Sequence, residues 1–353
     1  MSLLLAATVC AAEVTRLKSD EQIVFYPTIG QRVPGQDAWR LEIRGCVFEP
    51  EKGRVSLALL RGALELKHVE MSAAEQTTFT ERARLFLVDH ERGKRVFVRI
   101  GDKLFPVGKS GADGNFAGEV LLEDREIRKL RETAAGDARL PFTAEMPPGD
   151  TRRFAGEVLL LDETGLCVIS DIDDTIKITN VRDRRTMLRN TFLRDFQAVP
   201  GMAESYQRLA CSNRATFHFV SASPWQLYVP IAEFVRTNGF PAGTFALRRF
   251  RWKDRSVASL LASPEKYKTG VIAPLLKRFP KRTFILIGDS GERDPEIYAA
   301  LARKFPDQVQ HILIRDVTGE PATAERYWRA FAGLPRDRWQ IFREPREINV
   351  ALD

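Results

Sequence analysis

Apolar and polar positions follow different patterns in the two halves of the chain. In the first half the apolar runs are short, and residues 39–48 alternate between apolar and polar side chains before ending at Pro50. A period of two is typical of half-buried strands. The runs 85–88 and 95–100 flank turn residues and predict a hairpin. We therefore predict a β-rich, sandwich-like domain over residues 20–164.

The same domain contains two helical patterns and one repeated string. Residues 54–66 and 73–83 carry apolar side chains at helical spacing. The string FAGEVLL occurs at 116–122 and again at 154–160. Seven residues are too few to define a domain repeat, so we interpret them as two similar strands of one antiparallel sandwich.

After Gly165, apolar runs of strand length alternate with helical segments, which predicts a parallel sheet wrapped by helices. The predicted strands are 166–170, 216–220, 283–287 and 309–314, and the predicted helices are 201–210, 225–238, 267–278 and 295–304. Four aromatic residues of the tail predict a last helix packed on the core, and they are Trp328, Phe331, Trp339 and Phe342. The fold class is therefore α/β, with a Rossmann-type sheet domain over residues 165–353.

The composition is that of a globular protein with an excess of basic residues. The 353 residues include 54 Lys and Arg against 47 Asp and Glu, which gives a formal net charge of +7. This charge favours anionic partners such as phosphates, acidic lipid surfaces or nucleic acid. No apolar run reaches the roughly 20 residues that span a bilayer. The four cysteines, Cys10, Cys46, Cys167 and Cys211, lack the spacing of a zinc or disulfide framework.

The N-terminal segment, residues 1–12, is apolar and ends in small residues. It has the pattern of the back half of a secretory signal, with Val9 and Ala11 at the positions of the small-residue cleavage rule, but it lacks a basic n-region. Export to the periplasm, a peripheral position at a membrane and a cytoplasmic location therefore all stay open.

Three carboxylates follow the first predicted strand of the second half, at Asp171, Asp173 and Asp174. Acids placed directly after a buried strand lie at the carboxyl end of the sheet, where α/β folds bind their ligands. Neighbouring carboxylates repel one another, so this group favours a bound cation. An exposed acidic turn before a helix is the alternative interpretation.

Further polar residues follow the next predicted strands. Ser221 comes after the second strand, Asp289 and Asp294 come after the third, and Lys268 lies near the start of the helix before that third strand. Because parallel strands share one carboxyl edge, these side chains are expected to converge on one crevice.

Such a set contains the groups that phosphoryl transfer requires. A carboxylate can attack phosphorus and form an aspartyl-phosphate, while a second carboxylate protonates the leaving oxygen and then activates water. A hydroxyl and a cationic side chain can hold the phosphoryl oxygens, and Mg²⁺ can neutralise the charges. Taken one at a time, Ser221 and Asp294 have the ordinary interpretation of helix caps, and Lys268 that of a solvated side chain.

These residues resemble the motifs of the haloacid dehalogenase superfamily of phosphatases, because they occur in the same order and each follows the expected strand or helix. The longer strings FVSASPWQLY, from Phe219, and FILIGDSGERDPEIY, from Phe284, are similar to the actin-patch phosphatidate phosphatase family and its bacterial relatives. The strong part of the resemblance covers roughly residues 166–314, and the β-rich first half fits more loosely. The resemblance implies a haloacid-dehalogenase-like fold for the second half.

The resemblance also implies a role for each matching residue. Asp171 would be the nucleophile and a Mg²⁺ ligand. Asp173 would be the general acid and base, with its backbone carbonyl as a second ligand. Asp289 would bind Mg²⁺, directly or through water, and Asp294 would support it. Lys268 would stabilise the charge of the nucleophile.

Two hydroxyls complete the set that the resemblance implies. Ser221 would bind the phosphoryl group. Thr175 would order the turn next to the substrate and is counted with the substrate-binding residues. We assign Asp174 no role beyond local charge.

The string GDSG at 288–291 also matches the surroundings of the nucleophile in chymotrypsin-like serine proteases. That interpretation requires a partner histidine and aspartate on a β-barrel. Here the string ends a predicted strand and opens a helix, and His218 lies inside an apolar strand, as a core residue does. The context therefore argues against a protease.

The spacing between Asp171, Ser221 and Lys268 leaves no room for a large cap domain, so the predicted site is open and suits large or embedded substrates. Residues 182–196 combine apolar and arginine side chains. As a helix, this segment has the pattern of one that rests on an anionic membrane. A helix packed on the core, with solvated arginines, is the alternative.

We hypothesise a Mg²⁺-dependent phosphatase that acts on a lipid phosphomonoester such as phosphatidate, with peripheral contact to an anionic membrane. Nucleic acid is not expected as a partner, and the oligomeric state is left open. A phosphatase for a phosphoprotein, a nucleic-acid end or a small metabolite is the alternative among enzymes. In a different class, the β-rich domain would dock on a membrane or a protein while the phosphatase half is secondary.

Overall fold

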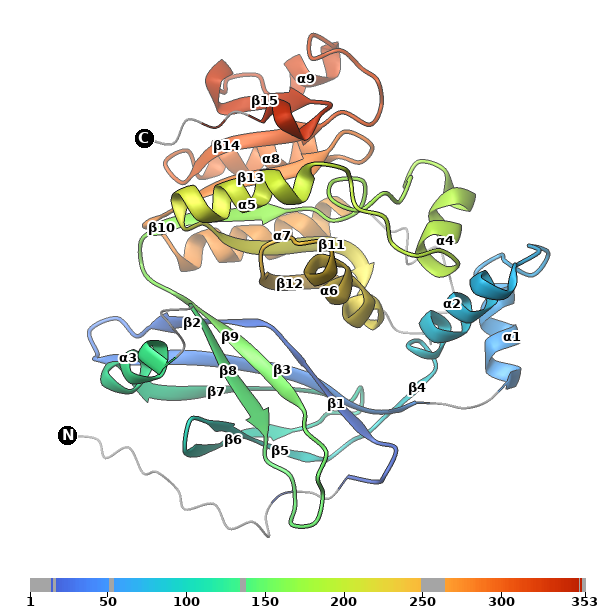
Figure 1. Ribbon diagram of the computed structural model, residues 1–353. Coiled ribbons are helices and arrows are strands. Elements are labelled where there is room, and N and C mark those ends of the chain that lie inside the picture. The colour runs from blue at the N-terminus through green and yellow to red at the C-terminus, as the bar shows by residue number, and fades with distance from the viewer. Residues whose placement is uncertain are drawn as a thin grey trace. The chain divides into compact units, whose positions relative to one another are not determined.

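The computed structural model (Figure 1) describes residues 14, 17–50, 54–133, 138–248, 264–348 and 350. The chain divides into two compact units, which we call the β unit and the α/β unit. The β unit contains Met1–Lys52 and Leu87–Asp162, and the α/β unit contains Gly53–Phe86 and Glu163–Asp353. The predicted signal segment, residues 1–12, lies outside the described residues.

The β unit is built on one curled, nine-stranded sheet (Figure 1). Its strands are β1 (Gln22–Tyr26), β2 (Thr28–Arg32), β3 (Ala38–Pro50), β4 (Val88–His90), β5 (Arg95–Ile100), β6 (Lys103–Lys109), β7 (Asn115–Glu123), β8 (Arg139–Ala144) and β9 (Ala155–Leu161), and its helix is α3 (Asp124–Thr133). The strand order is β1-β3-β2-β9-β8-β5-β6, with β4 and β7 both paired to β3. The pairs are antiparallel except that of β2 with β9.

The alternation that predicted β3 also decides which of its side chains are buried. Trp39, Leu41 and Ile43 are fully buried, while the residues between them are partly exposed, as the two-residue period of a strand requires. The repeated string supplies β7 and β9 to the same core, through corresponding positions of the two copies: Phe116 and Phe154, Val120 and Val158, Leu122 and Leu160. The sandwich-like packing of this unit stays a prediction.

The predicted hairpin between 85–88 and 95–100 is wrong. β4 pairs with β3, and β5 pairs with β6 and β8. The tight turn of this region lies between β5 and β6 instead, where Gly101 has a φ of 58°. Left-handed residues of this kind suit a two-residue hairpin loop.

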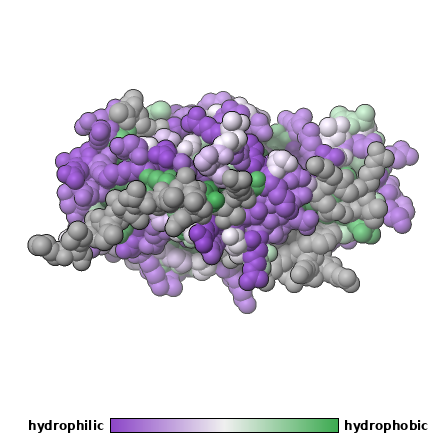
Figure 2. All heavy atoms as spheres, turned by 90° about the horizontal axis from the view of Figure 1, so that it is seen from below, coloured by the Kyte–Doolittle hydropathy of each residue, from purple (hydrophilic) through white to green (hydrophobic). Residues whose placement is uncertain are grey.

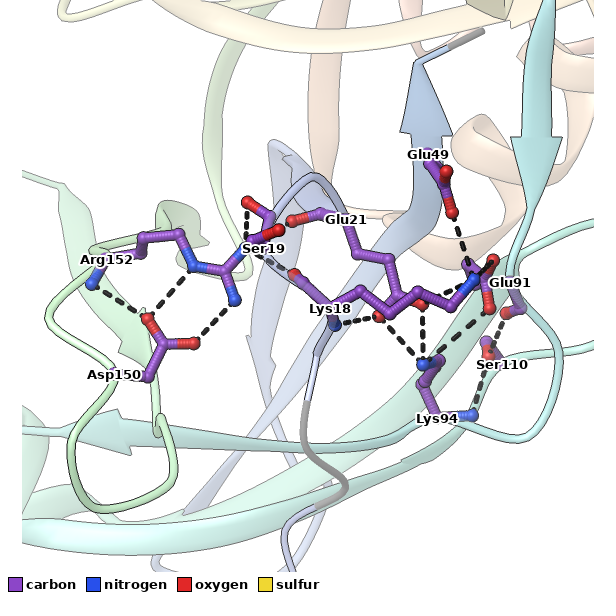
Figure 3. Close-up of polar contacts among 9 residues, drawn as sticks. All are labelled: Lys18, Ser19, Glu21, Glu49, Glu91, Lys94, Ser110, Asp150 and Arg152. Atoms are coloured by element: carbon purple, nitrogen blue, oxygen red, sulfur yellow. Dashed lines mark hydrogen bonds and ion pairs between the residues drawn. The ribbon is translucent and has the colours of Figure 1, made fainter.

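A network of charges fixes the segment before β1 (Figure 3). The Nζ atom of Lys94 donates to both carboxylate oxygens of Glu21, at 2.8 and 2.7 Å, and the Glu21 side chain is fully buried. Arg152 donates to the backbone oxygens of Lys18 and Glu21 at 2.9 and 2.7 Å. Its remaining donors are held by Asp150.

The α/β unit contains a six-stranded sheet in which all neighbours are parallel. Its strands are β10 (Gly165–Ser170), β11 (Thr216–Pro224), β12 (Gly243–Arg248), β13 (Arg282–Asp289), β14 (Val309–Arg315) and β15 (Trp339–Phe342). The order β12-β11-β10-β13-β14-β15 is the doubly wound order 3-2-1-4-5-6. The prediction of an α/β fold with a parallel sheet is confirmed. The strand order reverses between β10 and β13, the point at which such sheets bind ligands.

Helices lie on both faces of this sheet. In Figure 1, α5 (Met202–Asn213) and α6 (Tyr228–Thr237) lie in front of the strands, and α7 (Pro264–Arg278) and α8 (Asp294–Lys304) lie behind them. Helices on both faces bury the strands from both sides, which explains why β10 and β13 read as continuous apolar runs.

The expected last helix is only partly right. The helix α9 (Glu325–Ala330) is short, and Trp328 on it is exposed. Trp339 and Phe342 lie instead in β15, the sixth strand, and the Trp339 ring stacks on Phe331 at 4.5 Å. Four residues are too few to show a strand period, so no pattern in the sequence predicted β15.

The helices α1 (Arg54–Ala63) and α2 (Ala73–Arg84), which we had placed in the first domain, belong to the α/β unit. α2 contacts both α1 and α4 (Arg184–Phe192) of the same unit. The rings of Phe86 and Phe192 are 5.6 Å apart, and Arg82 donates to two backbone oxygens at the end of α4, at 2.7 and 2.6 Å. These contacts explain why the α/β unit is discontinuous in sequence.

The helix α4 uses its apolar side for this packing. Leu188 and Phe192 are buried, and Arg189 pairs with Glu75 of α2 at 2.8 Å. The segment 182–196 therefore follows the alternative of a core-packed helix and does not present an apolar face to a membrane.

Exposed apolar residues are scattered rather than gathered. The exposed large hydrophobic side chains in the described part of the chain are Leu59, Leu121, Ile178, Val229 and Trp328. Figure 2 shows one face on which hydrophilic residues dominate and the apolar patches are small. Within the described ranges, none of the helices has the length and apolar content of a membrane-spanning segment.

Candidate active site

The two strands at the reversal of strand order each end in a carboxylate. β10 and β13 run side by side up to the pair Ser170 and Ile287. Asp171 follows at once, and its N–H donates to the backbone oxygen of Ile287 at 2.8 Å. Asp289 is the last residue of β13. The two side chains therefore share the carboxyl edge of the sheet because their strands are neighbours.

Lys268, on α7, joins this edge to the loop after β13. Its fully buried Nζ atom lies 2.9 Å from Oδ1 of Asp171, 2.6 Å from Oδ1 of Asp294 and 3.2 Å from Oε2 of Glu292. Burial alone would lower the pKa of Lys268, but the negative charges, led by Asp171 and Asp294, raise it well above its usual value. The lysine is therefore held as an ammonium by the carboxylates that it bridges.

The backbone after β13 approaches Asp294 very closely. A Cβ at Gly288 would lie 2.2 Å from Oδ2 of Asp294, so only glycine fits there. The same Oδ2 accepts the N–H of Asp289 at 3.2 Å, and Oδ1 of Asp289 accepts the N–H of Gly291 at 2.6 Å. The glycines of the GDSG string thus serve the close packing of this loop.

Asp171, Asp289 and Asp294 form a group that fits a divalent cation. They are all buried, and one carboxylate oxygen from each lies within 4.8 Å of the others. Oδ2 of Asp289 is buried and has no hydrogen-bond donor among the described residues. Burial, followed by the charges of neighbouring carboxylates, raises the pKa of Asp171 and of Asp289 well above its usual value. For Asp171 the charge of Lys268 opposes this rise only in part. A hard cation that takes oxygen ligands would relieve this repulsion.

A second group of close carboxylates lies in the β unit and consists of Glu21, Glu49 and Glu91. It differs from the first group in the number of lysines that contact it. Lys18 lies 3.1 Å from Glu49 and 3.5 Å from Glu91, and Lys94 holds Glu21 (Figure 3). Two lysines therefore already neutralise most of the charge of these three carboxylates.

Asp173 accepts four hydrogen bonds or ion-pair contacts. Oδ1 receives Lys177 and Thr179, each at 2.8 Å, and Oδ2 receives the hydroxyls of Ser221 at 2.8 Å and Ser223 at 2.9 Å. Burial on its own would raise the pKa of Asp173. The charge of Lys177 and these hydrogen bonds outweigh it and hold the pKa well below its usual range. Asp173 is therefore ionised in this arrangement.

The loop after Asp173 is ordered by two further side chains. The Asp174 carboxylate accepts the N–H groups of Thr179, Asn180 and Val181, at 2.8, 2.7 and 2.7 Å. The fully buried Thr175 donates its hydroxyl to Oδ2 of Asp171 at 3.1 Å. Asp174 thus has a structural role that the sequence did not reveal.

The structure places the predicted site residues in two groups of contacts. The first group contains Asp171, Thr175, Lys268, Asp289 and Asp294. The second contains Asp173 and Ser221. Their catalytic roles stay predictions.

Four contact residues were missed by sequence reasoning: Lys177, Thr179, Ser223 and Glu292. Ser223 left a signal, because it lies two residues after Ser221 in an extended strand and so faces the same side. The others lie in loops, where no periodic pattern marks them.

The protease interpretation has no support at Ser290. Its hydroxyl lies 3.1 Å from Oγ1 of Thr318 and accepts the N–H of Val317 at 2.9 Å. His218 is buried in β11, with Nδ1 2.7 Å from Oγ1 of Thr244.

The fold and the site define an α/β domain with a carboxylate and lysine centre at the switch point of its sheet. Residues 166–316 match the family model described as phosphatidate phosphatase APP1, catalytic domain. This match confirms the resemblance over residues 166–316, which are similar to a phosphatase catalytic domain.

Two curated proteins are similar to the chain. The phosphatidate phosphatase APP1 of Saccharomyces cerevisiae is 40% identical over 154 residues, which is 43% of this chain and 26% of the yeast protein. An uncharacterized protein of Schizosaccharomyces pombe is 33% identical over 173 residues, which is 48% of this chain and 28% of that protein. The matches thus span about a quarter of the length of these relatives.

Among solved structures, a putative β-phosphoglucomutase from Thermotoga maritima covers 51% of this chain and 95% of its own. Its sequence identity is 12% and its TM-score is 0.30, values at which the likeness supports no conclusion.

Proposed function

We propose that this chain is a Mg²⁺-dependent phosphatase that hydrolyses a lipid phosphomonoester, in the first instance phosphatidate, through an aspartyl-phosphate on Asp171. The observation that carries the proposal is the buried cluster at the switch point, in which Asp171 is held 2.9 Å from Lys268 beside Asp289 and Asp294. The match to the phosphatidate phosphatase catalytic domain supports the substrate class. Membership of the haloacid dehalogenase superfamily is part of the same proposal.

In this proposal Asp171 and Asp289 would bind the Mg²⁺, with Asp294 in support and the backbone carbonyl of Asp173 as a further ligand. When bound, the ion would supply positive charge to the phosphoryl oxygens and the nucleophile. The orphaned Oδ2 of Asp289 and the close carboxylate oxygens support this assignment.

Two side chains orient the nucleophile. Lys268 holds Oδ1 of Asp171, and Thr175 holds Oδ2. One of these oxygens forms a bond to phosphorus while the ester bond breaks, and the leaving oxygen takes a proton from Asp173. A water molecule then gives a proton to Asp173 and attacks the aspartyl-phosphate, which releases inorganic phosphate and restores the Asp171 carboxylate.

Asp173 must carry a proton in the first of these steps. Its four donors favour the ionised form, which is the form that accepts a proton from water. A serine hydroxyl can rotate and donate to a different acceptor. A turn of Ser221 towards a phosphoryl oxygen would therefore bind the substrate and remove one of the two hydroxyl donors from Oδ2 of Asp173, which favours the protonated form.

The test is a comparison of wild type with Asp171→Asn, in the full chain with Mg²⁺, on phosphatidate vesicles and on a soluble phosphomonoester. We expect phosphate release by the wild type on both substrates and a fall of at least about 10³-fold in the variant. Asp183→Asn is the matched control, because Asp183 is an exposed N-cap that accepts the N–H of Thr186 at 3.1 Å, and asparagine caps as well.

The two outcomes separate the alternatives. Turnover of soluble phosphomonoesters without release from phosphatidate vesicles would reject the lipid substrate and favour a phosphoprotein, nucleic-acid end or metabolite. Vesicle binding by a wild type that turns over none of them would favour the docking class. Deletion of residues up to about 160 is a poor test, because it removes α2 and its contacts to α4.

The lipid substrate would bring the chain to an anionic surface, to which its net charge of +7 is suited. This membrane contact is a consequence of the proposed substrate and does not depend on α4.

A further inference from the structure

The loop between β10 and α4 is held in place by strong local contacts. Asp174 binds three consecutive backbone N–H groups, those of residues 179 to 181. Asn180 has a φ of 59°, a left-handed conformation that asparagine tolerates better than most residues other than glycine. Asn190 adds a hydrogen bond to the backbone oxygen of Thr179 at 3.2 Å. Arg182 therefore extends from an anchored backbone.

The side chain of Arg182 lies against the turn after β13. Its Cδ is 3.6 Å from the position that a Cβ on Gly291 would take. The N–H of Gly291 in turn donates to Oδ1 of Asp289 at 2.6 Å. Arg182 thus reaches from the loop after β10 to the loop after β13, the two loops that flank the switch point.

Other cations around the site are already engaged. Lys268 contacts three carboxylates, Lys177 pairs with Asp173 at 2.8 Å, and Arg315 donates to a backbone oxygen at 2.7 Å. Arg182 is exposed and has no hydrogen bond or ion pair with another described residue. A dianionic phosphate that approaches a site rich in carboxylates needs a cation that is not yet neutralised.

We propose that Arg182 is a substrate-binding residue whose guanidinium contacts the non-bridging oxygens of the substrate phosphate; this rests on the phosphatase function proposed above. The planar fork of a guanidinium donates two parallel hydrogen bonds to a phosphate, which the single ammonium of a lysine does not. The contact exists in the bound ground state as well as during reaction. It therefore affects the affinity for substrate and for free phosphate more than the turnover number.

The test uses Arg182→Met, Arg182→Lys and the control Arg185→Met, in the full chain with Mg²⁺. Arg185 is an exposed arginine in the first turn of α4, so its replacement changes the net charge equally. The measurements are kcat and KM on p-nitrophenyl phosphate, the inhibition constant of inorganic phosphate, and KM on phosphatidate vesicles. For Arg182→Met we expect KM and the phosphate inhibition constant to rise about tenfold or more, with kcat within about threefold. Lysine should restore part of the affinity, and Arg185→Met should behave as wild type.

Two results would overturn the assignment. Equal changes in Arg182→Met and Arg185→Met would mean that net charge, and not a contact, is responsible. A change on vesicles alone, with KM for the soluble substrate and the phosphate inhibition constant unaltered, would place Arg182 at the lipid surface and not at the phosphate. Failure of the underlying function is recognised separately, because the wild type itself would then release no phosphate.

Discussion

Replacing Lys268 by methionine removes an ammonium on which three carboxylates depend. Lys268 is fully buried, and its contacts with Asp171, Asp294 and Glu292 are 2.9, 2.6 and 3.2 Å long. Methionine is of similar length and leaves no cavity of note, so the substitution tests the charge. Without the ammonium, the carboxylates of Asp171 and Asp294 lose their cationic partner in a buried setting.

The expected loss is large because a buried charge is left without its partner. Removing one member of a buried ion pair costs about 3–5 kcal/mol, whereas an exposed pair contributes about 0–1 kcal/mol. Lys281→Met is the matched control, since Lys281 pairs with Glu163 at 2.6 Å with both side chains more than half exposed. We therefore expect a difference of about 2–5 kcal/mol between the two variants in the free energy of unfolding of the α/β unit.

Hydrogen exchange in increasing urea measures this free energy for each unit of the full chain. In EDTA, peptides from β10 and β13 should lose protection at lower urea in Lys268→Met, while peptides from β3 serve as an internal reference in the β unit. Added Mg²⁺ should recover more stability in this variant than in wild type, because the ion would take over the neutralisation of the carboxylates.

A loss below about 1 kcal/mol in Lys268→Met, equal to that of Lys281→Met, would refute the reasoning. So would a loss of the expected size that Mg²⁺ does not reduce, because the carboxylates would then not form a cation site.

Two further predictions concern stability. Burial, with smaller effects of nearby arginines, lowers the pKa of the His218 imidazole from 6.5 to about 3. Between these pH values the unfolded chain binds a proton that the folded chain does not bind. The free energy of unfolding therefore falls as the pH drops below about 6.5. At pH 5 the free energy of unfolding should be about 2 kcal/mol lower than at pH 8. Urea unfolding should show a smaller difference between these pH values in His218→Asn. An unchanged pH dependence in this variant would contradict the prediction. In the β unit, Lys94→Met removes the closer of the two ammonium groups at the buried Glu21, which lies at 2.7 Å against 3.6 Å for Lys18, and should cost about 3 kcal/mol. Lys18→Met, at a side chain that is 62% exposed, should cost under about 1 kcal/mol. Equal losses of stability in the two variants, measured by hydrogen exchange, would contradict the interpretation of Lys94 and Glu21 as a buried pair.

The sequence by itself determined the α/β class and pointed to seven residues of the candidate site. Apolar runs of strand length between helical segments predicted four of the parallel strands, because side chains buried on both faces must be apolar along the whole strand. A carboxylate directly after such a strand, as at Asp171, has to lie at the carboxyl edge. Parallel strands then bring Asp289 and Ser221 to the same edge without further information.

The tertiary structure decided the features that depend on contacts between distant segments. Lys177, Thr179 and Ser223 surround Asp173 only because a loop and a second strand meet there. In the same way, α2 joins the α/β unit because it packs on α4. This packing also buries the apolar side of a segment for which the sequence left a membrane surface and the core as alternatives.

The strands β4 and β15 escaped prediction for a related reason. The period of a pattern is a local property, and a strand of three or four residues shows too little of it. Which strand pairs with which, and which lysine neutralises which carboxylate, is set by burial and hydrogen bonding across the folded chain. These interactions join residues that the sequence keeps apart, so they exist only once the chain has folded.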